Sequence, residues 1–104
     1  MSNDQTMQLS DSLFPSLVSG WKQCTIRAGK RDIEPGLLTF ISAIDPERTH
    51  LCYVHRVSFV RFGDLTLADA QKDNATTVEE LQSVLKQYYP TLTDKDIVTI
   101  VEFS

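Results

Sequence analysis

Three residue types that can do chemistry together occur between residues 20 and 27. Lys22, Thr25 and Arg27 follow one another closely behind Gly20. A hydroxyl can attack a carbonyl carbon when a neighbouring base removes its proton, and a guanidinium can hold an anionic or polar planar group. The segment therefore indicates nucleophilic chemistry on a small polar ligand, although the pattern Lys-x-x-Thr-x-Arg also arises by chance.

Lys22 can act as the base only if its surroundings allow it. A solvated ammonium keeps its proton at neutral pH, so Lys22 must be buried, whereas an exposed side chain at a helix end is the alternative. In a regular strand residues 22 and 25 would point to opposite sides, so Lys22 must lie in a turn before the strand of Thr25. Asp69 and Asp73, four residues apart on a predicted helix, share one face and can direct a carboxylate at Lys22.

The two cysteines and two histidines indicate neither a thiol nucleophile nor a metal centre. Cys24 alternates with Thr25, so only one of them can face a given side of a strand. We expect Cys24 and Cys52 to be free and buried rather than paired in a disulfide. Neither His50 nor His55 stands at a standard zinc spacing from a cysteine. We therefore expect no metal and no cofactor.

The charge is unevenly distributed along the 104 residues. The formal net charge is −4, which argues against broad electrostatic wrapping of nucleic acid. Residues 1–63 carry a net +1 and residues 64–104 a net −5, and Lys22, Arg27, Lys30 and Arg31 form the one dense basic stretch. This stretch is either a solvated face or the rim of a pocket for one nucleotide. In the second case Arg27, Lys30 and Arg31 are the candidate substrate-binding residues.

Length and composition predict one soluble domain. No apolar run approaches the roughly 20 residues that span a bilayer. The first ten residues have neither a basic start nor an apolar stretch, so they do not resemble a secretion signal. We expect a cytoplasmic protein without a membrane partner, with residues 1–11 as a flexible N-terminal tail and residues 12–104 as the domain.

Turn residues and hydrophobic periodicity place the elements along the domain. Thr66 with Asp69, and Thr77 with Glu80, have the spacing of helix-capping boxes. Both faces of residues 49–60 are substantially apolar, which is typical of a barrel wall covered by helices. The class is therefore α+β with a small, partly closed sheet. The expected elements are a helix at 12–21, an extended segment at 24–27, a hairpin of strands 37–44 and 49–60, helices at 66–74 and 77–89, and a strand at 97–103.

The order of these motifs resembles the ASCH domain family, and within it the small bacterial N4-acetylcytidine amidohydrolases. Gly20-Trp21-Lys22-Gln23-Cys24-Thr25-Ile26-Arg27 is similar to the family signature Gly-x-Lys-x-x-Thr-x-Arg. Pro35-Gly36 before an apolar strand, Ala70 to Asn74, Glu80-Leu81, Tyr89-Pro90 and Val101-Glu102-Phe103 follow in the family's order. The resemblance covers residues 13–104.

This resemblance implies a PUA-like fold, a small mixed β-barrel flanked by helices. It also implies that Thr25 is the nucleophile, that Lys22 assists it, and that Asp73 stands where the family has a glutamate. The expected reaction removes the acetyl group from N4-acetylcytidine, a small nucleoside, or from a related acylated cytosine nucleoside. The alternatives are a non-catalytic module that binds single-stranded RNA, and an RNA-cleaving ASCH protein.

Overall fold

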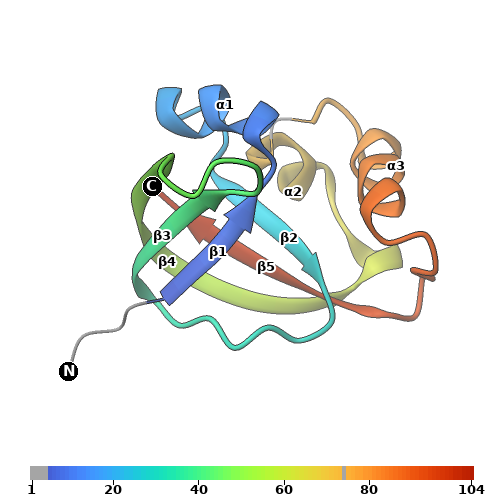
Figure 1. Cartoon of the computed structure of the whole chain (residues 1–104). Coiled ribbons are helices and arrows are strands. Elements are labelled where there is room, and N and C mark those ends of the chain that lie inside the picture. The colour runs from blue at the N-terminus through green and yellow to red at the C-terminus, as the bar shows by residue number, and fades with distance from the viewer. Residues whose placement is uncertain (1–4, 74) are drawn as a thin grey trace.

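The β-branched runs and turn residues of the sequence form five strands in the described part of the chain, packed against three α-helices (Figure 1). The computed structural model describes residues 5–73 and 75–104. The expected α+β class is confirmed. The elements in chain order are β1 (Gln5–Leu9), a 3-10 helix (Asp11–Leu13), α1 (Phe14–Ser19), β2 (Cys24–Ala28), β3 (Gly36–Ser42), β4 (Thr49–Arg61), a second 3-10 helix (Phe62–Asp64), α2 (Leu67–Lys72), α3 (Val78–Tyr88) and β5 (Ile97–Phe103).

The strands form one curled, mixed sheet in the order β1-β3-β4-β5-β2. β3 and β4 pair antiparallel as the expected hairpin, and β4, β5 and β2 continue antiparallel. β1 runs parallel to β3 at one edge. The curl brings β1 and β2, the two edge strands, onto the same side of the molecule, where the ribbon places α1 above them (Figure 1).

The expectation of a flexible tail over residues 1–11 is wrong for its second half. Residues 5–9 form β1, which pairs with β3 from Gln5↔Leu38 to Leu9↔Ser42, and a 3-10 helix begins at Asp11. Met7 and Leu9 point into the core while Thr6 and Gln8 face outward. This is the alternation of a half-buried strand in a segment of five residues. Residues 1–4 lie outside the described part.

The first α-helix is shorter than the expected 12–21. Pro15 occupies its first turn, where its missing N–H costs nothing, and Gly20 ends it with a left-handed φ of 86°. Trp21 therefore falls beyond the helix and is 72% exposed. The early stop leaves residues 21–23 as a separate turn before β2.

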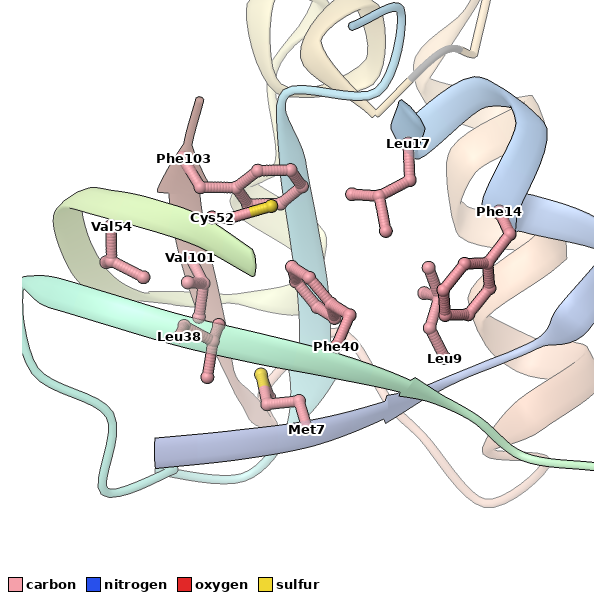
Figure 2. Packing of buried hydrophobic residues seen from close by; sticks show 10 residues of the cluster. All are labelled: Met7, Leu9, Phe14, Leu17, Leu38, Phe40, Cys52, Val54, Val101 and Phe103. Atoms are coloured by element: carbon pink, nitrogen blue, oxygen red, sulfur yellow. The ribbon is translucent and has the colours of Figure 1, made fainter. Parts of the chain in front are cut away.

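Two buried clusters occupy the two faces of the sheet. One lies beneath α1 and includes its Phe14 and Leu17, with Phe40 and Phe103 packed at a ring-centroid distance of 5.0 Å (Figure 2). The other lies beneath α2 and α3. β5 contributes to both clusters because its alternate residues point to opposite faces. The sheet therefore has helices on each side, but not over its whole area.

The expectation that helices cover both faces of β4 is wrong for its first half. Cys52 and Val54 are buried, whereas Leu51 and Tyr53 are 59% and 52% exposed. The reason is the placement of α2 and α3, whose cluster draws on β2, β5 and the end of β4 and includes no residue of β3. The outer face of the β3–β4 hairpin is consequently open to solvent.

Both predicted caps at the starts of α2 and α3 form. Thr66 Oγ1 accepts from the Asp69 N–H, and the Asp69 carboxylate accepts from the Thr66 N–H, which is a complete capping box. Thr77 caps α3 in the same way, but the Glu80 carboxylate accepts from Thr76 Oγ1 instead of closing the box. No helix in residues 5–73 or 75–104 is long and apolar enough to cross a membrane.

Candidate active site

Backbone hydrogen bonds fasten Lys22 in the turn between α1 and β2. Its N–H donates to the Ser16 carbonyl at 3.0 Å, and the Gln23 N–H donates to the Lys72 carbonyl at 2.8 Å. The second bond joins this turn to the last turn of α2, whose C-cap residue is Asp73. Lys22 therefore lies before the strand that carries Thr25, as strand alternation required, and next to the end of α2.

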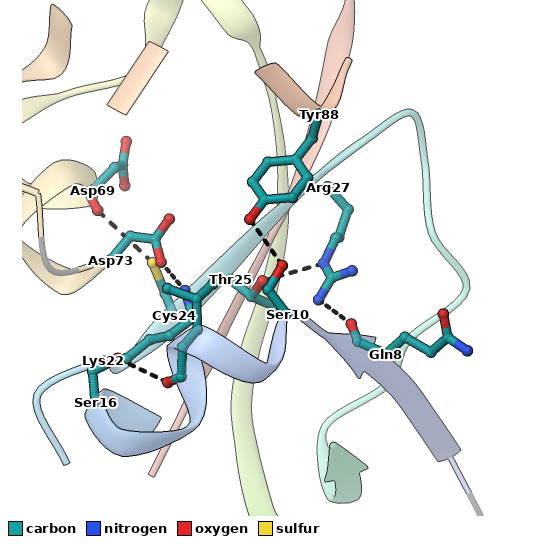
Figure 3. A network of polar contacts seen from close by, with 11 residues as sticks. Gln8, Ser10, Ser16, Lys22, Cys24, Thr25, Arg27, Asp69, Asp73 and Tyr88 are labelled. Carbon is teal, nitrogen blue, oxygen red and sulfur yellow. Dashed lines mark hydrogen bonds and ion pairs between the residues drawn. The ribbon is translucent and has the colours of Figure 1, made fainter. Parts of the chain in front are cut away.

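Lys22 and Asp73 form an ion pair between Nζ and Oδ1 (Figure 3). The two side chains are only 4% and 13% exposed. Burial raises the pKa of the Asp73 carboxyl, and the positive charges of Lys22 and Arg27 oppose that rise. A carboxyl whose proton affinity is raised in this way is a better proton acceptor for the amine that it contacts.

Thr25 and Arg27 share one face of β2. Cys24 and Ile26 point to the other face, into the cluster beneath α2 and α3. Thr25 is 4% exposed, and its Oγ1 accepts a hydrogen bond from Arg27 Nε at 3.2 Å. Arg27 Nη2 also donates to the Gln8 carbonyl of β1 at 2.7 Å (Figure 3). Burial lowers the pKa of Arg27, but a guanidinium stays charged in proteins at neutral pH.

All four of these side chains line one cavity of about 210 Å³. Lys22, Thr25, Arg27 and Asp73 give it a polar wall that combines a buried amine, a hydroxyl, a guanidinium and a carboxylate. Side chains of α3 and of the 3-10 helix before α1 supply an apolar wall. The apolar lining residues there are Leu13, Leu81, Val84 and Leu85.

Two hydroxyl groups that the sequence did not single out meet at this cavity. Ser10 Oγ and Tyr88 Oη are 2.9 Å apart, and both residues line the cavity. Tyr88 follows the buried Leu81 and Leu85 at helical spacing along α3, yet it is 54% exposed. No sequence signal joins Ser10 to Tyr88, because their contact depends on where β1 and α3 dock on the sheet.

Comparison with solved structures identifies the fold that carries this site. An ASCH domain from Lactobacillus crispatus superimposes with a TM-score of 0.79 at 8% identity, covering 96% of this chain and 79% of that one. A protein of family DUF984 from Enterococcus faecalis gives a TM-score of 0.73 at 12% identity, with coverages of 100% and 77%. The hypothetical protein PH0355 gives 0.71 at 19% identity, with 97% of each chain covered.

The chain has the ASCH fold. The structural matches thus confirm the PUA-like architecture that the motif order implied. No family model and no curated protein matches the sequence. At identities of 8–19% the solved structures establish the fold alone.

Within this ASCH fold, Lys30 and Arg31 do not reach the cavity. Gly29, with a left-handed φ of 77°, ends β2 and turns the chain away from the site. Arg31 Nε donates to the Ala28 carbonyl at 2.9 Å, and Lys30 Nζ lies 5.8 Å from the centre of the Phe59 ring. Of the three residues expected to bind substrate, Arg27 alone lines the cavity.

The cysteines of this ASCH fold are free and buried, as expected. Burial raises the pKa of the Cys52 thiol to about 11 and raises that of the Cys24 thiol further. Both thiols therefore stay protonated near neutral pH, which disfavours a thiolate nucleophile beside Thr25. Within residues 5–73 and 75–104 no three His, Cys, Asp or Glu side chains cluster so that they could hold a metal ion.

Proposed function

We propose that this protein is an amidohydrolase that removes the acetyl group from N4-acetylcytidine or a related acylated cytosine nucleoside. The observation that carries the proposal is the buried Lys22–Asp73 ion pair, which opens into the same cavity as the Thr25 hydroxyl. A hydroxyl nucleophile needs a proton acceptor, and this pair provides an amine backed by a carboxylate. Lys22, Thr25 and Asp73 are the catalytic residues of the proposal.

In the first step Thr25 Oγ1 attacks the acetyl carbonyl carbon. As the new C–O bond forms, Lys22 takes the Thr25 proton and passes one of its own protons to Asp73. Such a relay lets a charged lysine serve as the acceptor, because burial raises the pKa of Asp73 and so favours transfer of a lysine proton to its carboxylate. The tetrahedral intermediate collapses when the C–N bond breaks and the relay returns a proton to the departing amino nitrogen of cytidine.

In the second step water attacks the acetyl ester on Thr25. Lys22 and Asp73 again accept a proton, now from the water, and then return it to Thr25 Oγ1 as the ester bond breaks. Acetic acid leaves and loses its remaining proton to solvent as acetate, and the Thr25 hydroxyl is restored. The positive charges of Lys22 and Arg27 favour the negative oxygen of each tetrahedral intermediate.

The dimensions and lining of the cavity support a small substrate. About 210 Å³ is less than the roughly 300–1,000 Å³ of pockets that enclose drug-sized ligands, so the acylated base can enter while the ribose stays at the mouth. The apolar wall formed by α3 favours a planar ring.

Ultraviolet spectroscopy tests this proposal directly, because removal of the acetyl group changes the absorbance of the cytosine ring. Purified protein is mixed with N4-acetylcytidine, and Lys22→Met serves as the inactive comparison. We expect the wild-type protein to convert the nucleoside to cytidine and acetate with catalytic turnover, and Lys22→Met to lose that turnover.

Binding or cleavage of single-stranded RNA is the competing outcome. If the wild-type protein leaves N4-acetylcytidine and a panel of other acylated cytosine nucleosides untouched but retains single-stranded RNA, the amidohydrolase proposal is overturned in favour of an RNA-binding module. Cleavage of that RNA, without hydrolysis of the nucleosides, would instead favour a nuclease.

A further inference from the structure

Arg27 carries a charge that no carboxylate in the described part of the chain neutralises directly. Among residues 5–73 and 75–104, Asp73 pairs with Lys22, and Arg27 belongs to no ion pair within 4.0 Å. Its Nε and Nη2 groups donate hydrogen bonds to uncharged oxygens, Thr25 Oγ1 and the Gln8 carbonyl. A guanidinium held in this way directs its positive charge at the Thr25 hydroxyl.

The hydrogen bond from Arg27 also fixes how the Thr25 hydroxyl is oriented. Nε–H can only donate, so Thr25 Oγ1 accepts from it and must direct its own proton elsewhere. Nη2 is held by the Gln8 carbonyl at 2.7 Å, which anchors the guanidinium plane to β1. Strand alternation places Thr25 and Arg27 on the same face of β2, where both line the cavity.

We infer that Arg27 is a positioning residue for the Thr25 nucleophile, orienting its hydroxyl and favouring the negative charge that develops on Oγ1 as the proton leaves. This inference rests on the proposed function and assigns Arg27 a role different from the substrate binding first expected of it. An electrostatic donor aimed at a reacting oxygen acts mainly in the transition state, so its loss lowers kcat. A residue that only holds substrate would instead raise KM.

Replacement of Arg27 by alanine, followed by addition of guanidinium at millimolar concentration, separates these roles. With N4-acetylcytidine as substrate, we expect Arg27→Ala to lower kcat by about 10²–10³-fold with KM unchanged. Added guanidinium should restore part of kcat by occupying the vacated position. Arg27→Lys keeps the charge but lacks the planar fork. Its KM should equal that of the wild-type protein, and its kcat should lie between those of the wild-type protein and Arg27→Ala.

Arg61→Ala is the matched control, because Arg61 is exposed on β4 and does not line the cavity. Its kcat should equal that of the wild-type protein and should not respond to guanidinium. Circular dichroism melting of each variant checks folding, and Arg27→Lys keeps the test decisive if Arg27→Ala does not fold.

The outcomes distinguish this inference from the proposed function. A wild-type protein that hydrolyses no acylated cytosine nucleoside overturns both. An active wild-type protein whose folded Arg27 variants show a raised KM and an unchanged kcat overturns the inference alone, and leaves the amidohydrolase proposal standing.

Discussion

The proton affinity of one carboxyl group sets the pH range in which the proposed relay works. Asp73 is buried against Lys22, and burial raises the pKa of its carboxyl above the ordinary value of 3.8. The relay requires Asp73 to be ionised so that it can accept a proton from Lys22. Activity should therefore depend on pH through this residue.

The pH dependence of kcat/KM checks this expectation. As pH falls through the raised pKa of Asp73, the carboxyl becomes protonated and can no longer accept a proton, so the rate should fall on an acid limb centred above pH 3.8. Asp73→Asn should lose at least about 10²-fold in kcat and lack this limb. Asp73→Glu, which keeps a carboxyl group, should stay active. Wild-type rates in Asp73→Asn would exclude the relay.

Single residues of the site were predictable from the sequence only where a local motif joins them. Lys22 and Thr25 lie three positions apart, and strand alternation correctly required Lys22 to precede the strand. Asp73 came from its spacing with Asp69 on the predicted helix and from the motif order that resembles the family. Ser10 and Tyr88 are 78 positions apart and were missed, because nothing local relates two hydroxyls that meet through tertiary packing.

At the scale of elements, β1 is the strand that was wrongly predicted to be a tail. The site depends on this strand. The strand has only five residues, and its polar positions made it resemble a tail. Its parallel pairing with β3 depends on residues far along the chain, which a local pattern cannot reveal. β1 supplies core side chains and the Gln8 carbonyl that anchors Arg27.

Substitutions in β1 distinguish a core strand from a tail. Met7→Ala should lower the free energy of unfolding by about 2–5 kcal/mol, because Met7 is 9% exposed and belongs to the cluster beneath α1. Thr6→Ala, on the outward face of the same strand, should change it by no more than about 0.5 kcal/mol. Urea denaturation measures both. Equal stability of Met7→Ala and the wild-type protein would restore the tail interpretation.

At the scale of the whole molecule, the pattern of elements along the chain predicted the α+β class, and the motif order that resembles the ASCH family predicted the architecture. The sequence did not predict how much of the sheet the helices cover. The apolar residues on both faces of β4 suggested burial on both sides, yet Leu51 and Tyr53 are exposed because α2 and α3 lie over β2 and β5. Sequence alone does not specify which part of a sheet a helix covers.

Cys52 is buried on one face of the sheet and Cys24 on the other, so the accessibility of the two thiols reports on the packing of both faces. Cys24 is 0% and Cys52 3% exposed, and burial raises the pKa of each thiol. A thiol-specific colorimetric reagent at pH 8 should label neither cysteine in the native protein and both after unfolding in guanidinium chloride. Rapid labelling of the folded protein would show that one of these faces is open.

The central claim is that the hydroxyl of Thr25 attacks the acyl group, and the most direct measurement compares Thr25→Ala with Thr25→Ser. Both substitutions are small, but only serine keeps a nucleophilic oxygen at the end of the Arg27 hydrogen bond. With N4-acetylcytidine, Thr25→Ala should lose roughly 10³-fold or more in kcat, while Thr25→Ser retains measurable turnover. Hydrolysis by Thr25→Ala at the wild-type rate would contradict the account.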